Sequence, residues 1–195
     1  MNIKHDKEQV LKTGLGLICN KGYNSLGVDE ICKVTGMTKG AFYNAFKSKE
    51  NFLLDGLKVY GEMTVKRLTT QLSKENNKPL AIDRLKDLYD SMFEAQPKNN
   101  FMGCMVNNVM SELGSNNHTV GSVAAIEFNS FVEAIEPCVK EAQGNGDLTL
   151  SIDSKTLTEL LHATFYGALT ITKSMQDHHQ GKRMMQTLLN TLQNE

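Results

Sequence analysis

The stretch that decides the fold is Thr38-Lys39-Gly40-Ala41-Phe42-Tyr43-Asn44-Ala45-Phe46-Lys47-Ser48-Lys49-Glu50, near the start of a chain of 195 residues. Threonine is favoured at helix N-caps, so Thr38 predicts a short helix from Lys39 to Phe46. Phe42 and Phe46 are four residues apart and share one face of that helix, which we expect to be buried. The opposite face then presents side chains that can meet another molecule, namely Lys39, Gly40, Tyr43 and Asn44.

A second short helix is predicted just before this one, from Val28 to Val34, and the tight turn Thr35-Gly36-Met37 separates the two. A pair of this size is typical of a helix-turn-helix, whose second helix enters the major groove of DNA. Phosphate contacts position such a helix and base-edge contacts give specificity. We therefore expect Gly40 to let the backbone approach the DNA, phosphate contacts from Thr38, Tyr43, Lys47 and Lys49, and groove contacts from Lys39 and Asn44.

Apolar residues recur three and four apart along almost the whole chain, which predicts an all-α fold of about nine helices. Before the helix-turn-helix, a first helix should end at Gly22. After it we expect a long helix capped by Ser48, a helix with Pro79 in its first turn, a short helix stopped by Gly114, a helix interrupted by Pro137, and helices over about 153–175 and 179–192. Asn145-Gly146 followed by Leu148-Thr149-Leu150 leaves a β-hairpin open as an alternative at that point.

The composition excludes several classes of protein. No stretch approaches the ~18 consecutive apolar residues of a membrane-spanning helix, so we expect no membrane association and a cytoplasmic location. The four cysteines are far apart, and no cysteine lies near the one histidine pair, so we predict reduced thiols, no metal site and no cofactor. No phosphate loop or catalytic triad pattern supports an enzyme. Residues 1–50 carry eight lysines against five acidic residues, a basic excess that suits contact with a polyanion.

The last two predicted helices are apolar on more than one side, so they must be covered on more than one side. At a chain end the same helix pair from a second copy would provide that cover, as a four-helix bundle with two-fold symmetry. An ordinary buried core helix is the alternative. The residues expected at this homodimer interface are Leu161, Leu169, Met185, Leu188 and Leu192.

Residues 7–53 resemble the N-terminal domain of TetR-family transcriptional regulators. The resemblance rests on Val10-Leu11, Gly22-Tyr23, Val28-Asp29-Glu30-Ile31, and the run from Thr35 through Leu53. It implies a helix-turn-helix DNA-binding domain over 1–50, a ligand-binding and dimerisation domain over 51–195, and a homodimer on double-stranded palindromic operator DNA. Gly27, Asn44 and Ala45 depart from the family pattern, which commonly has a hydroxyl residue, a histidine, and a histidine or tyrosine there.

The body of the chain offers residues for sensing a small hydrophobic or electrophilic effector. Gly103-Cys104-Met105 and Lys173 are similar to positions in a TetR subgroup that includes electrophile-sensing repressors, which suggests Cys104, assisted by Lys173, as a redox or electrophile sensor. An inert, half-buried thiol is the alternative. The residues that could line an apolar pocket, rather than only fill the core, are Phe101, Met105, Phe128, Phe131, His162, Phe165 and Tyr166.

These observations predict a transcriptional repressor that leaves its operator when an inducer binds or a thiol is modified. The alternative is a helix-turn-helix DNA-binding protein that has no small-molecule inducer and is controlled by a protein partner.

Overall fold

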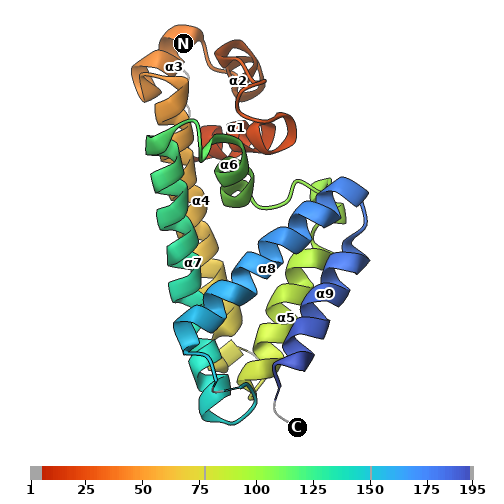
Figure 1. Cartoon of the computed structure of the whole chain (residues 1–195). Helices are drawn as coiled ribbons and strands as arrows, with labels where there is room; N and C mark the ends of the chain where they lie inside the picture. Colours follow the sequence, from red (N-terminus) through yellow and green to blue (C-terminus); the bar gives the residue numbers. More distant parts are fainter. Residues whose placement is uncertain (1–5, 77, 150, 194–195) are drawn as a thin grey trace. The chain divides into compact units, whose positions relative to one another are not determined.

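The computed structural model of the chain describes residues 6–76, 78–149 and 151–193, and within these ranges it contains nine α-helices and no strand (Figure 1). The all-helical prediction is confirmed. The helices are α1 (Lys7–Lys21), α2 (Val28–Thr35), α3 (Lys39–Phe46), α4 (Lys49–Leu72), α5 (Ala81–Glu94), α6 (Met105–Leu113), α7 (His118–Gly144), α8 (Ser154–Met175) and α9 (His178–Thr191), with short 3-10 turns at Lys74–Asn76 and Pro97–Asn99.

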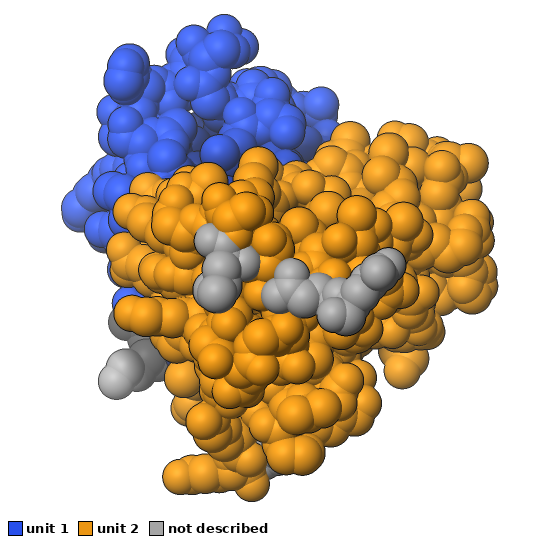
Figure 2. Space-filling model, turned by 60° about the horizontal axis from the view of Figure 1, so that its bottom comes forward, with its two compact units in different colours: residues 1–63, 104–128 blue, residues 64–103, 129–195 orange. Residues whose placement is uncertain are grey.

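The chain packs into two compact units that do not follow chain order (Figure 2). The first unit contains residues 1–63 and 104–128, and the second contains 64–103 and 129–195. Both α4 and α7 therefore contribute to each unit. The domain boundary that the sequence predicts after residue 50 separates a DNA-binding part from a ligand-binding and dimerisation part. The two packing units do not test this functional boundary, which stays a prediction.

The first unit is built on three aromatic rings and one glycine. The rings of Phe42 and Phe46 lie 5.5 Å and 4.9 Å, centroid to centroid, from the ring of Phe52 on α4. Gly14 of α1 lies directly against Phe52, since a Cβ on this residue would stand 2.4 Å from the ring. The missing side chain thus lets α1 pack closely on the cluster that also anchors α3.

Local signals place the ends of the first helices as predicted. Gly22 and Gly36 both have positive φ, 81° and 71°, at the ends of α1 and α2, where a residue with a side chain would be strained. The Thr38 hydroxyl accepts a hydrogen bond from the Ala41 amide at 3.2 Å, and the Ser48 hydroxyl accepts one from the Asn51 amide at 3.0 Å. The turn geometry of the helix-turn-helix is therefore encoded locally.

The start of α5 differs from the expectation, because Pro79 lies before the helix rather than in its first turn. The cause is Arg84, whose side chain is buried and whose Nη1 donates to the carbonyl oxygens of Lys78 and Pro79, both at 2.9 Å. Its Nη2 donates to Glu141 at 2.7 Å. The guanidinium holds these carbonyls in a turn and joins α5 to the end of α7.

The second unit has a core of apolar side chains from α5, α7, α8 and α9. Helices α8 and α9 pack against each other, and α9 also packs against α5 (Figure 1). Helix α7 continues through Pro137, and residues 145–149 form no strand, so no described residue supports the hairpin alternative. Leu150 lies outside the described residues. None of the described helices has the length and apolar character needed to cross a membrane.

The residues expected at a dimer interface are placed in two different environments. Leu161, Leu169 and Met185 are buried inside the second unit of the single chain, so they serve its own core. Leu188 and Leu192 are partly exposed. Three of the five residues are thus core positions of the single chain, and the dimer interface stays a prediction.

One face of α8 is exposed along its length. Its residues follow one another three or four positions apart, which keeps them on one side of the helix. Leu160 and Met175, at its two ends, are 50% and 58% exposed, and between them the face is made of small side chains. The exposed residues between these ends include Ala163, Gly167, Thr170 and Ser174.

Candidate DNA-binding surface and effector-responsive residues

Helix α3 is oriented as its sequence predicts. Phe42 and Phe46 are buried, while Tyr43 on the opposite side is 47% exposed. Lys39, Gly40 and Asn44 are exposed beside it. The position of a Cβ on Gly40 has only the Thr38 hydroxyl within reach, at 4.0 Å, so the backbone at the start of α3 is open to a close approach.

Lys39 has a partner within the chain. Its Nζ lies 2.7 Å from a carboxylate oxygen of Asp29 on α2, and both side chains are well exposed. The hydrogen bond from Lys39 to Asp29 raises the pKa of the lysine. An exposed ion pair of this kind is worth little and opens readily. Lys39 is thus held at the surface of the helix-turn-helix and can exchange Asp29 for another acceptor.

Lys47 and Lys49, both expected at DNA phosphates, have different surroundings. Lys47 is exposed at the end of α3, with a positive φ of 67°, and its Nζ donates to the Asn44 carbonyl at 3.1 Å. The Lys49 ammonium instead donates to the carbonyls of Tyr23 and Leu26, both at 2.9 Å, and lies 4.0 Å from the centre of the Tyr23 ring. Burial lowers the pKa of Lys49. Its ammonium therefore secures the segment between α1 and α2.

Glu112, on α6, holds the same segment from the other side. Its carboxylate accepts hydrogen bonds from the amides of Tyr23 and Asn24, both at 2.8 Å. A further bond runs from Asn117, after α6, to Glu50 at the start of α4, at 2.6 Å. The sequence analysis missed the clamp that Glu112 forms on the amides of Tyr23 and Asn24. Glu112 lies nearly ninety residues from these two amides, and no local sequence pattern marks the contact.

Cys104 stands at the opposite end of α6, as its N-cap residue. Its side chain is only 8% exposed, and its sulfur accepts a hydrogen bond from the Tyr60 hydroxyl of α4 at 3.6 Å. Helix α6 thus carries the expected sensor residue at one end and the Glu112 clamp at the other. Lys173 belongs to the second unit, and its assistance to Cys104 stays a prediction.

The residues expected in an apolar pocket are divided between the two units. In the second unit, the His162 ring lies between 4.8 and 6.0 Å, centroid to centroid, from the rings of Phe131, Phe165 and Tyr166. This aromatic cluster continues to Tyr89 and Phe93 of α5. Phe101 also belongs to the second unit, whereas Met105 and Phe128 belong to the first. Their common pocket stays a prediction.

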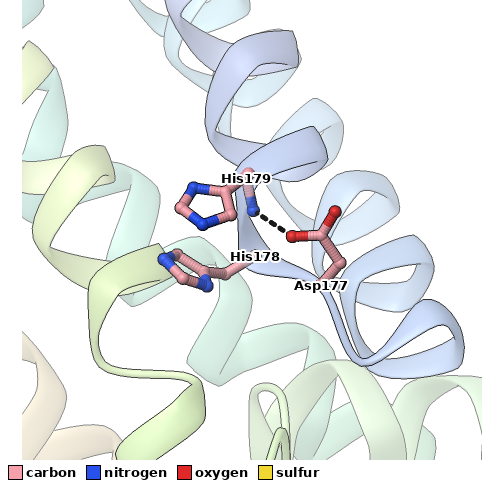
Figure 3. A group of neighbouring side chains, drawn as sticks. All are labelled: Asp177, His178 and His179. Carbon is pink, nitrogen blue, oxygen red and sulfur yellow. Dashed lines mark hydrogen bonds between the residues drawn. The ribbon is translucent and has the colours of Figure 1, made fainter.

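A further group of polar side chains lies at the turn between α8 and α9 (Figure 3). One ligand atom each from Asp177, His178 and His179 lies within 4.8 Å of the others. An oxygen of Asp177 accepts a hydrogen bond from the His179 amide at 2.9 Å and caps α9. The sequence analysis considered only cysteines as possible companions of the histidine pair, and the prediction of no metal site stays a prediction.

We predict that alanine substitutions of Lys47 and Lys49, the two lysines after α3, affect different properties. The first should change DNA binding and the second the stability of the fold. Lys47→Ala should lower the slope of log affinity against log salt by about 1, since an exposed phosphate contact is lost, and leave the melting temperature unchanged. Lys49→Ala should cost about 1–3 kcal/mol of stability, because two carbonyls lose their donor. Anisotropy titrations with duplex from the region upstream of the gene, together with urea unfolding, measure both quantities. Equal stability of the two variants would contradict this assignment.

A second prediction concerns acid stability. Burial lowers the pKa of His162 to about 4, below the value of about 6.5 for an unfolded histidine. The unfolded chain therefore takes up the proton first, and stability that is complete above about pH 6.5 falls as the pH drops toward 4. The free energy of unfolding changes by up to about 1.4 kcal/mol per pH unit in this range. Urea unfolding between pH 7.5 and 4.5 should show a shallower slope for His162→Leu, while His118→Ala, an exposed control, should keep the wild-type slope.

Comparisons with known proteins agree with this geometry. Residues 10–55 match the family described as bacterial regulatory proteins, tetR family, and residues 81–188 match the family described as tetracyclin repressor-like, C-terminal domain. The transcriptional regulator AcuR of Cereibacter sphaeroides is 28% identical over 85% of this chain and 75% of its own length. The transcriptional repressor NemR of Escherichia coli K12 is 25% identical over 85% and 83%. The crystal structure of a regulatory protein TetR from Rhodobacter sphaeroides superposes with a TM-score of 0.86, at 25% identity, over 95% of this chain and 97% of its own.

Proposed function

Because the chain belongs to the TetR family of transcriptional regulators, we propose that it is a homodimeric repressor in the cytoplasm that leaves operator DNA in response to an effector. The effector is a small hydrophobic molecule or an electrophile or oxidant that modifies Cys104. The observation that carries this proposal is the placement of Cys104 and Glu112 at opposite ends of the nine-residue helix α6. The thiol at one end of that helix is buried, and Glu112 at the other end holds the segment that precedes the helix-turn-helix.

In the proposed DNA complex, α3 lies in the major groove. Its exposed face and open N-terminal backbone support this placement, because unpaired amides at a helix N-terminus attract phosphate. Lys39 and Asn44 reach base edges, while Thr38, Tyr43 and Lys47 contact phosphates. In a two-fold symmetric dimer the two copies of α3 enter successive major grooves, about 34–36 Å apart. A palindromic operator is the matching DNA sequence.

We assign dimerisation to the exposed face of α8 together with α9. The small residues between Leu160 and Met175 allow two copies of α8 to approach closely. Apart from the adjacent residues and backbone of α8 itself, no described residue has an atom within 4 Å of a Cβ position on Gly167. The two end residues are large, exposed and apolar, and a partner would remove them from water. The proposed surface adds the exposed face of α8 to the partly exposed Leu188 and Leu192 that the sequence predicts at the interface.

Release from DNA follows from the strain that a modified Cys104 imposes. An α,β-unsaturated carbonyl forms a bond between its β-carbon and the sulfur, while the thiol proton ends on its α-carbon. The sulfur is almost fully buried and bonded to Tyr60, so an added group must displace its surroundings. A shift of α6 then moves the carboxylate of Glu112, which holds the amides of Tyr23 and Asn24. The effector thereby favours a state in which the DNA-binding helices are wrongly placed.

The DNA-binding part of the proposal predicts that Lys39→Ala and Tyr43→Phe weaken operator binding without unfolding the protein. Both side chains are exposed, so their loss removes contacts to DNA rather than core packing. The measurement is fluorescence anisotropy at fixed salt with the upstream duplex, with circular dichroism as the check on folding. Wild-type affinity in both variants would overturn this placement of α3.

The sensing part predicts that Cys104→Ser binds the operator normally but no longer responds to a quinone or to hypochlorite. Cys19→Ser is the matched control, because Cys19 is a partly exposed thiol on a different helix, α1. It should respond as the wild type does. Unchanged release of Cys104→Ser eliminates the thiol mechanism. If neither electrophiles nor hydrophobic compounds release the protein, control by a protein partner replaces it.

A further inference from the structure

The turn between α8 and α9 brings together donor groups that transition metals prefer. The imidazole rings of His178 and His179 lie side by side, with their centroids 4.1 Å apart, and Asp177 directly precedes them (Figure 3). The capping bond to the His179 amide uses Oδ1 of Asp177. Its second oxygen, Oδ2, can therefore serve a different partner while the helix stays capped. Imidazole and carboxylate together suit zinc, nickel and cobalt ions.

A fourth donor comes from the neighbouring helix α5. Oε2 of Glu94 lies 3.5 Å from Nε2 of His178. Metal–ligand bonds of 2.0–2.2 Å in tetrahedral geometry separate two ligand atoms by about 3.3–3.5 Å, so this pair is already spaced to share one ion. The other oxygen of Glu94 accepts a bond from Lys182 at 2.7 Å. That bond fixes the carboxylate of Glu94 in place beside His178.

We propose that His178, His179, Glu94 and Asp177 bind one divalent transition-metal ion of the zinc, nickel and cobalt class. His178 and Glu94 provide the preformed pair, while side-chain rotation brings in His179 and Asp177, each of which has a ligand atom within 4.8 Å of one on His178. The ion joins the first turn of α9 to the last turn of α5, two helices that also pack against each other. The site is independent of the proposed operator and effector functions.

The test uses the full-length protein without an affinity tag, freed of metal by a chelator, with Ni²⁺ as the probe in calorimetric titration. We expect one ion per chain and a rise in melting temperature when the ion is added, since a ligand that binds the folded state stabilises it. The double variant His178→Ala/His179→Ala should bind at least tenfold more weakly. Glu94→Gln should also weaken binding, and Asp177→Asn should do so while keeping the cap, because asparagine caps helices as well.

The control is His118→Ala, which removes an exposed histidine at the start of α7 in the first unit and should bind as the wild type does. A Co²⁺ spectrum distinguishes this site from the cysteines, because thiolate ligands add an ultraviolet charge-transfer band that nitrogen and oxygen ligands lack. The absence of binding, equal binding by wild type and the double variant, or a thiolate band would each overturn the proposal. Operator binding by all of these variants should match the wild type, so the result does not depend on the proposed repressor function.

Discussion

The carboxylate of Glu112 is the contact that fixes the segment joining α1 to α2. It accepts two backbone amides from this segment, and the Lys49 ammonium donates to two carbonyls of the same segment. Hydrogen bonds with an ionised partner are shorter and stronger than neutral ones. The short polar segment just before the helix-turn-helix is thus fixed by one anion and one cation.

This arrangement explains why α6 is suited to relay a signal. Helix α6 has nine residues, and both of its ends are bonded to other parts of the unit. In the proposed mechanism a displacement at Cys104 would reach Glu112 through this one short helix. Such coupling needs a second, discrete arrangement of the packed elements.

Features set by neighbours in sequence could be predicted, and those set by distant partners could not. The four-residue spacing of Phe42 and Phe46 fixes the exposed face of α3, and the Thr38 cap fixes where the helix begins. Lys49 was expected at DNA because only its charge and position are visible in the sequence. Its carbonyl partners lie more than twenty residues away.

The same limit applies elsewhere in the chain. Helix α5 begins later than predicted because Arg84 donates hydrogen bonds to two carbonyls before the helix and to Glu141, which is distant in sequence. The periodicity of α8 showed that several faces are apolar but did not show which of them the chain itself covers. The donor set at the α8–α9 turn needs Glu94, which lies more than eighty residues before His178. In each case the missing information is the identity of a tertiary partner.

The pairing of Lys39 with Asp29 has a consequence for how random DNA is rejected. In the proposed DNA complex the lysine is assigned to base edges, whereas in the free protein it forms an exposed ion pair with this carboxylate. A sequence that offers no acceptor in the right place would leave the lysine on its internal partner. Because an exposed ion pair is worth little, this competition would make only a small contribution to the difference in affinity between correct and incorrect binding sites.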